Sequence, residues 1–163
     1  MDCAPSLGGI KRVWLTQYKP GLATLISDGG IDVIECFGMG TDRKWYEYQF
    51  RKGTGSLTST LTVDETAGIN YVTNELSLVF TKMETAKRME IAALAVGQLC
   101  AVVEDSNGKY WFLGYDDYVS ASAGTGVTGT AKGDQNAYTI TLTTDSATFP
   151  YELAENAISQ LNE

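Results

Sequence analysis

Hydrophobic and polar residues alternate along much of this chain, a pattern typical of β-strands that bury one face. The clearest cases are Trp45–Phe50 and Ala137–Thr144, in which aromatic or aliphatic residues occupy every second position. Further strands are predicted at Lys11–Tyr18, Ile31–Phe37, Leu99–Glu104 and Lys109–Val119, the last with a bend at Gly114. The pattern therefore predicts a mainly β chain.

Two long runs, Ser56–Thr66 and Asn70–Lys82, flank a short segment that contains Gly68. This arrangement predicts a long projecting β-hairpin over about residues 56–82. Its outer half, around Asp64–Asn74, has too few apolar residues to belong to the core. Because an isolated two-stranded ribbon is marginally stable in water, we expect the arm to lie against a neighbouring subunit. The expected contact residues are Asp64, Glu65, Thr66, Gly68, Asn70 and Tyr71.

One helix is predicted with clear start and stop signals, over about residues 82–96. Thr81 and Glu84 form a capping box, good helix formers follow, and Gly97 supplies a left-handed end. A second, short helix is expected in the tail after Pro150. Together these elements predict one domain over residues 1–163, a β-sandwich or rolled antiparallel sheet with a flanking helix.

Residues 124–129 read GTGVTG, which matches the G-x-G-x-x-G string of dinucleotide-binding proteins. That motif requires a helix after the glycines to hold the pyrophosphate, whereas a threonine-rich strand follows here. We therefore interpret Ala121–Asp134 as a flexible loop between strands and predict no cofactor. Gly124, Gly126 and Gly129 are expected to give this loop its backbone shape at a subunit boundary.

The composition excludes several classes of chemistry. The chain has no histidine, so it lacks a Ser-His-Asp or Cys-His site and any metal site that needs imidazole. Cys3, Cys36 and Cys100 are too far apart for a zinc motif or a disulfide framework. The acidic pairs Asp116-Asp117 and Asp64-Glu65 have no calcium-loop spacing. We therefore expect neither an enzyme nor a metal site.

The charge balance argues against a nucleic-acid-binding protein. Twenty acidic and twelve basic residues give a net charge of −8, whereas binding through phosphates requires clustered lysine and arginine. No apolar run is long enough to span a membrane, and the N-terminus lacks the pattern of a signal peptide. We expect synthesis in the cytoplasm and no membrane association.

Three stretches resemble tail tube proteins of tailed bacteriophages, in the versions carried by phages of gut Bacteroidales. They are GGIKRVWL at Gly8–Leu15, the long stretch Val102–Asp134, and NAYTITLTTDSATFPYELAENA at Asn136–Ala157. The resemblance implies a structural virion protein that assembles with itself into a hexameric ring. Such rings stack into a tube, or form a tail or neck ring, through which genomic DNA passes without specific binding. It also implies contacts with other tail proteins.

An alternative from the residues alone is a carbohydrate-binding β-sandwich module. The aromatic run Tyr110-Trp111-Phe112, with Tyr115 and Tyr118, could line a sugar-binding face. Particle size in solution separates the two hypotheses, because only the first predicts rings or tubes.

Overall fold

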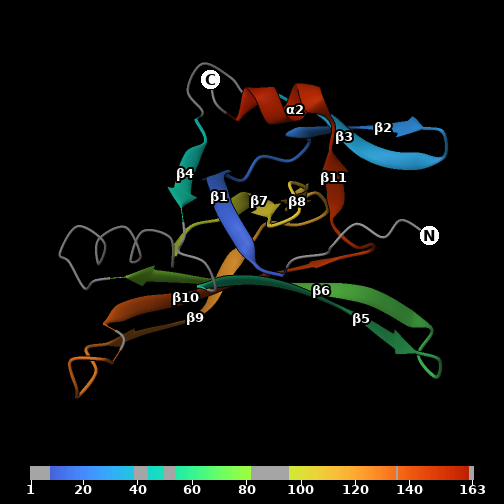
Figure 1. Cartoon of the computed structure of the whole chain (residues 1–163). Helices are drawn as coiled ribbons and strands as arrows, with labels where there is room; N and C mark the ends of the chain where they lie inside the picture. The colour runs from blue at the N-terminus through green and yellow to red at the C-terminus, as the bar shows by residue number, and fades with distance from the viewer. Residues whose placement is uncertain (1–7, 39–43, 50–53, 82–95, 135, 162–163) are drawn as a thin grey trace.

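The computed structural model describes residues 8–38, 44–49, 54–81, 96–134 and 136–161. It is mainly β, as the hydrophobic pattern predicts, and its strands form two sheets that pack face to face (Figure 1). The architecture is therefore a β-sandwich. The helix predicted over about residues 82–96 falls almost wholly outside the described residues.

The larger sheet has seven strands in the order β2-β3-β11-β8-β7-β1-β4. Their bounds are β1 Ile10–Gln17, β2 Ala23–Asp28, β3 Ile31–Phe37, β4 Tyr46–Gln49, β7 Leu99–Asp105, β8 Tyr110–Leu113 and β11 Tyr151–Leu153. All neighbours are antiparallel except β11 and β3, which run parallel. The sheet is thus mixed, because the chain returns from the smaller sheet to insert β11 between β8 and β3.

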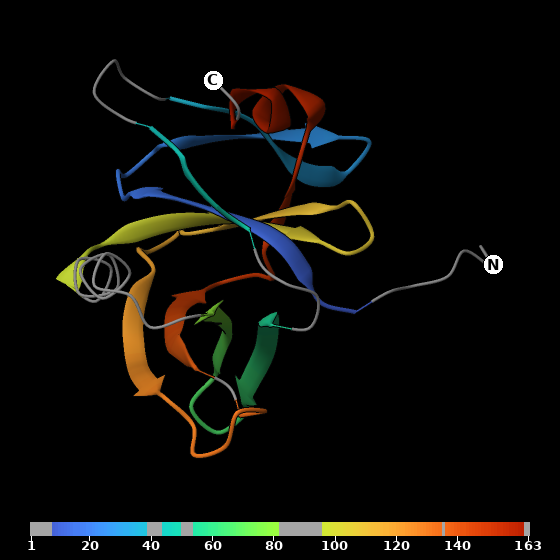
Figure 2. The ribbon, with the colours of Figure 1, turned by 60° about the vertical axis from the view of Figure 1, so that its left-hand side comes forward.

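The smaller sheet has four strands in the order β5-β6-β10-β9, all antiparallel. They are β5 Gly55–Asp64, β6 Ile69–Thr81, β10 Ala137–Ser146 and β9 Ser120–Val127. Figure 2 shows β9 and β5 on opposite sides of this sheet, with the larger sheet above it. One face of the smaller sheet is therefore covered, and no described strand or helix covers the other, which is called the free face below.

Two hydrophobic clusters hold the fold together, and β1 contributes to both. Val13 and Leu15 pack into the cluster between the two sheets, with Leu76, Leu142 and their neighbours. Trp14, which points to the opposite face, packs into the second cluster on the far side of the larger sheet. Both faces of β1 are consequently buried, which explains its run of large residues.

The short helix α2, Glu155–Gln160, closes the second cluster at its far end (Figure 1). Its Gln160 side chain accepts a hydrogen bond from the Phe37 backbone N–H at 2.7 Å and donates one to the Phe37 carbonyl at 3.3 Å. The predicted tail helix is therefore present. It begins later than expected because Tyr151–Leu153 forms β11.

Several details differ from the sequence prediction. The strand expected over Lys109–Val119 ends at Leu113, since Gly114 adopts a φ of 105° that turns the chain away. The strands β2, β9 and β11 were not predicted. The expectation that the whole outer half of the hairpin lies outside the core is wrong for Val72 and Asn74, which are 1% and 2% exposed.

Candidate assembly surface

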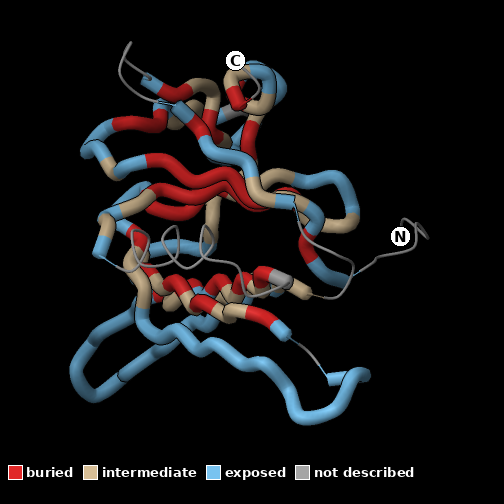
Figure 3. The backbone as a smooth tube through the Cα atoms, turned by 90° about the vertical axis from the view of Figure 1, so that its left-hand side faces the viewer, coloured by how far each residue is buried: buried red, intermediate tan, exposed pale blue. Residues whose placement is uncertain are grey.

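The long hairpin predicted over about residues 56–82 is present as β5 and β6. Strand β10 pairs with β6 only as far as Val72, which lies opposite Ser146. Beyond that pair, residues 62–71 form a two-stranded arm whose turn includes Gly68 at a φ of 68°. The residues at this end of the hairpin are exposed, whereas buried residues alternate with less buried ones along the paired part of β6 (Figure 3).

The arm exposes apolar side chains on both faces. Val63, and Leu61 just before the arm, lie on the core-facing side of β5 but are 57% and 50% exposed. On the opposite face, Ile69 and Tyr71 are 51% and 39% exposed. This concentration of uncovered apolar surface is typical of an interaction site.

The turn at the arm's tip is held by Asp64. Its Oδ1 accepts hydrogen bonds from the backbone N–H groups of Thr66 and Ala67 at 3.0 and 3.1 Å. Asp64 and Gly68 therefore shape the turn, while the neighbouring Glu65 is exposed. The six predicted contact residues of the hairpin all lie at this exposed end.

Polar side chains brace the base of the arm. Buried Asn74 accepts a hydrogen bond from the Ser59 hydroxyl at 2.7 Å and donates one to the Ser146 hydroxyl at 3.1 Å. Beside it, the Thr73 hydroxyl donates to Asp145 at 2.9 Å. These contacts join β5, β6 and β10, so the arm projects in a fixed direction.

The glycine-rich segment is not the flexible loop predicted from the sequence. Residues Ser120–Val127 form β9, in which Gly124 lies opposite Ile140 and Gly126 lies opposite Tyr138. The prediction was wrong because glycine has a low strand propensity, and here the neighbouring strand β10 supplies the hydrogen-bonding partner. Of the three predicted glycines, only Gly129, with a φ of 74°, lies in the turn that follows.

That turn is also ordered, by Asp134. Its Oδ2 accepts hydrogen bonds from the Thr130 and Ala131 backbone N–H groups, at 2.9 and 2.8 Å, and from the Thr130 hydroxyl at 3.0 Å. The Ala131 amide makes the largest contribution to lowering the pKa of Asp134, followed by the two groups of Thr130. A carboxylate dedicated to its own turn is not arranged to bind a nucleotide.

The two outer strands of the smaller sheet present open edges. Within the described residues, β5 pairs only with β6, and β9 pairs only with β10. Each strand therefore has a side from which backbone N–H and C=O groups can pair with another chain. Because the edges lie on opposite sides of one sheet, they suit a head-to-tail contact between copies.

The two edges are also staggered along the strand direction. Gly55, the first residue of β5, pairs with Leu78, which pairs with Ile140, which in turn pairs with Gly124. These four residues form one row across the sheet. From that row β5 extends only toward the arm and reaches beyond the end of β9 at Ser120. At the other end β9 reaches beyond the start of β5, as far as Val127. The sheet is thus skewed. Its β5 edge protrudes at the arm end, and its β9 edge protrudes at the opposite end.

The free face of the smaller sheet is rich in hydroxyl groups and weakly acidic. Alternate residues of the strands point to it, including Thr58 and Thr60 of β5, Glu75 of β6, and Thr141 and Asp145 of β10. The described residues of the four strands contain no lysine or arginine. This face lacks the cations that contact phosphates in nucleic-acid-binding proteins.

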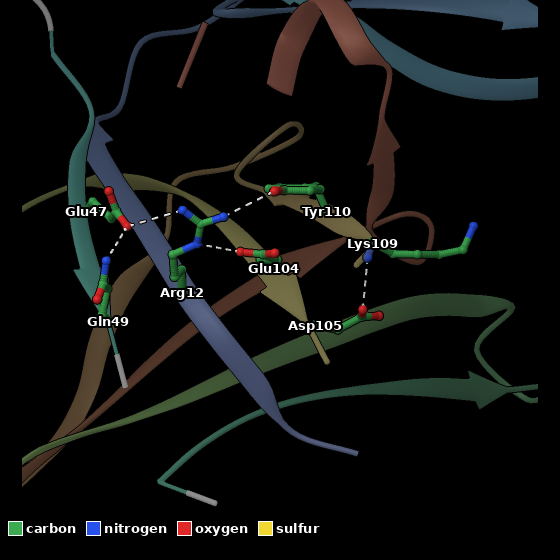
Figure 4. Close-up of polar contacts among 7 residues, drawn as sticks. All are labelled: Arg12, Glu47, Gln49, Glu104, Asp105, Lys109 and Tyr110. Atoms are coloured by element: carbon green, nitrogen blue, oxygen red, sulfur yellow. Dashed lines mark hydrogen bonds and ion pairs between the residues drawn. The ribbon is translucent and has the colours of Figure 1, made fainter. Parts of the chain in front are cut away.

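The main charged cluster lies elsewhere, on the larger sheet, where Arg12 sits between Glu47, Glu104 and Tyr110 (Figure 4). The hydrogen bond to Glu104 is the main cause that raises the pKa of Arg12, and burial is the main cause that raises the pKa of Tyr110. The guanidinium carbon also lies 4.9 Å from the centre of the Trp14 ring. These contacts join four strands, β1, β4, β7 and β8, which gives the cluster a structural role.

The carbohydrate-binding alternative rests on an aromatic run whose side chains mostly contact other residues of the fold. Phe112 is 2% exposed, and the Trp111 indole donates to Asp105 at 3.1 Å. Tyr115 and Tyr118 are 38% and 36% exposed, but each makes an edge contact with another ring, Tyr115 with Tyr151 and Tyr118 with Tyr18. The run does not present one continuous aromatic face.

The acidic pair Asp116-Asp117 is likewise engaged by the loops around it. Asp116 accepts a hydrogen bond from the Ala147 backbone N–H at 2.9 Å, and Asp117 accepts one from the Tyr118 backbone N–H at 2.8 Å. Among the residues that the structure describes, no three acidic or cysteine side chains are grouped as a metal site would require. None of the described helices is long and apolar enough to cross a membrane.

Comparison with known proteins gave no relatives for this chain. No family model matches the sequence, and neither the curated proteins nor the solved structures contain a significant match.

Proposed function

We propose that this chain is a structural protein of a bacteriophage tail, which assembles with itself into rings that stack into a tube. The observation that carries the proposal is the four-stranded sheet with two open, staggered edges. Neighbouring strands run in opposite directions from β5 to β9, so β5 of one copy pairs with β9 of the next in antiparallel orientation. Repeating this contact around an axis gives a closed ring.

The stagger favours a barrel with tilted strands. Full pairing of β9 against the neighbour's β5, with core-facing residues kept beside core-facing residues, requires a shift along the strands of about four or six residues, at about 3.3 Å each. Across the four strands of one copy, at about 4.8 Å per strand, this shift corresponds to a tilt of roughly 35–45°. That tilt is the usual one for closed β-barrels. Each copy therefore has the skew that a barrel segment needs.

The two faces of the sheet give the ring an inside and an outside. The larger sheet covers one face, so its bulk must lie outside the barrel. The free face, with its threonine hydroxyls and with Glu75 and Asp145, then lines the channel. Such a lining repels phosphates weakly and offers them no cationic contacts, which suits the passage of DNA without binding.

The arm provides the contact between stacked rings in this proposal. It projects along the strand direction beyond the last β10 pair, with its tip residues exposed. In a tube, that direction leads toward the next ring. Burial of Ile69 and Tyr71 there would remove their exposed apolar surface from water.

The proposal is tested by imaging the purified full chain by negative-stain electron microscopy and measuring its size by sedimentation velocity. We expect rings and short tubes. A chain that stays monomeric over a wide concentration range contradicts the proposal. Sugar binding by that monomer would favour the carbohydrate-binding alternative.

A matched variant separates ring formation from stacking. Replacing residues 63–70 with two glycines removes the tip but keeps Val72 in the core and the Thr73–Asp145 hydrogen bond. We expect this variant to form rings that no longer stack. Tubes formed by the variant would show that the arm is not the contact between rings.

A further inference from the structure

We propose a specific register for the contact between copies: Leu61 of one copy lies opposite Gly124 of its neighbour. The inference rests on the ring assembly proposed above and identifies the residues that form its junction. It follows from three properties of the two open edges, namely their directions, the faces on which their side chains lie, and the apolar surface that each leaves uncovered.

The faces of the sheet restrict the possible registers. Leu61 lies on the core-facing side of β5, in the row of buried Val72. Gly124 and Gly126 lie on the core-facing side of β9, in the rows of Ile140 and Tyr138. If the register between the copies shifted by one residue, core-facing side chains of one copy would lie beside channel-facing side chains of the next. Only alternate registers therefore keep both faces continuous.

The uncovered apolar surface selects among the remaining registers. With Leu61 opposite Gly124, Thr60 lies opposite Thr125 and Ser59 lies opposite Gly126. The exposed side chain of Leu61 then covers a strand position that has no side chain of its own. Aromatic residues are used in this way beside edge glycines, and the bulky Leu61 side chain would likewise shield the glycine backbone from water. Gly124 has room for this approach, since a Cβ built there would contact only the Thr139 carbonyl, at 3.8 Å.

The same register is also compatible with the β-bulge in β9 and with the exposed side chain of Val63. The β-bulge in β9, between the partners of Thr141 and Leu142, falls outside the segment from Gly124 to Val127. That segment can therefore form an unbroken ladder with β5. Beyond the bulge, Val63 comes beside Ala121, so the second exposed residue on this face is also covered. A register two residues lower places Leu61 beside Ala121 and leaves Val63 beyond the end of β9.

Cysteine cross-linking tests the register. In one chain, β6 and β10 separate Leu61 from Gly124, so the two lie at least about 14 Å apart and cannot form a disulfide within a copy. The background is the full chain with Cys3 and Cys36 replaced by serine, while Cys100 is fully buried and stays. Under mild oxidation we expect the L61C/G124C monomer to be converted into a series of disulfide-linked multimers. A reducing agent should restore the monomer.

Two control pairs and a mixing experiment complete the test. L61C/T125C places the cysteines on opposite faces and should not cross-link, and L61C/A121C reports the lower register. Mixing the two single variants L61C and G124C should give a linked dimer, which avoids any folding defect of the double variant. Rings that cross-link through L61C/A121C, or through neither pair, would overturn the register but leave ring assembly standing. A chain that forms no rings would overturn both.

Discussion

Arg12 donates a hydrogen bond from its Nε to the Glu104 carboxylate over 2.6 Å, and Glu104 is only 7% exposed (Figure 4). The pair links β1 to β7, since Arg12 lies opposite Glu104 in their register. Arg12 also reaches Glu47 on β4 at 3.5 Å. One arginine thus ties together the strands at one edge of the larger sheet.

Removing the buried partner should destabilise the fold. Glu104→Gln is expected to lower the free energy of unfolding by about 1–3 kcal/mol, because a charge-assisted hydrogen bond is lost beside a partly buried guanidinium. Urea denaturation followed by circular dichroism measures the change. Glu152→Gln is the matched control, since the Lys109–Glu152 pair is more exposed and should contribute less than about 1 kcal/mol. Equal effects of the two variants would contradict the prediction.

Gly114 is required at its position by both backbone and packing. Its φ is 105°, and an added Cβ would lie 3.1 Å from the Cys100 Sγ and 3.3 Å from the Cys100 Cα. Gly114→Ala should therefore lower the free energy of unfolding by about 2 kcal/mol or more. Gly133→Ala serves as the control, because a Cβ there meets nothing within 4 Å. A Gly114→Ala variant with an unchanged thermal midpoint would show that this turn relaxes freely.

Asp134 should control the order of the turn after β9 in a pH-dependent way. Hydrogen bonds, that from the Ala131 amide above all, lower its pKa in the folded state. The charged form is therefore favoured by folding, and its contribution is present above the unfolded pKa and lost as pH falls through the folded one. Amide exchange at Thr130 and Ala131, measured by nuclear magnetic resonance, should accelerate in Asp134→Ala at neutral pH. Lys132→Ala, in the same turn, should leave both amides protected.

The chain should be indifferent to duplex DNA. Its net charge is −8, and the described strands of the smaller sheet carry no basic residue. We expect no measurable binding of labelled duplex by fluorescence anisotropy at moderate ionic strength. Micromolar affinity that weakens steeply with added salt would show that phosphates are neutralised by cationic side chains after all.

Elements whose signals are local could be predicted from the residues of the chain. Ala137–Thr144 alternates residue by residue, and it lies within β10 with Ile140 and Leu142 buried. The hairpin was equally clear, because Gly68 marks a turn between two long alternating runs. In both cases burial follows from a period of two, which each strand carries in its own residues.

Elements that depend on a distant partner could not be predicted in this way and are seen only in the folded chain. Nothing in the glycines of β9 favours a strand, and β10 supplies the ladder that makes it one. The three residues of β11 likewise form a strand only between β8 and β3. The same reason explains why the assembly surface could not be read from the chain. Strand pairing joins segments far apart in sequence, so only the folded sheet shows that β5 and β9 are its two outer strands.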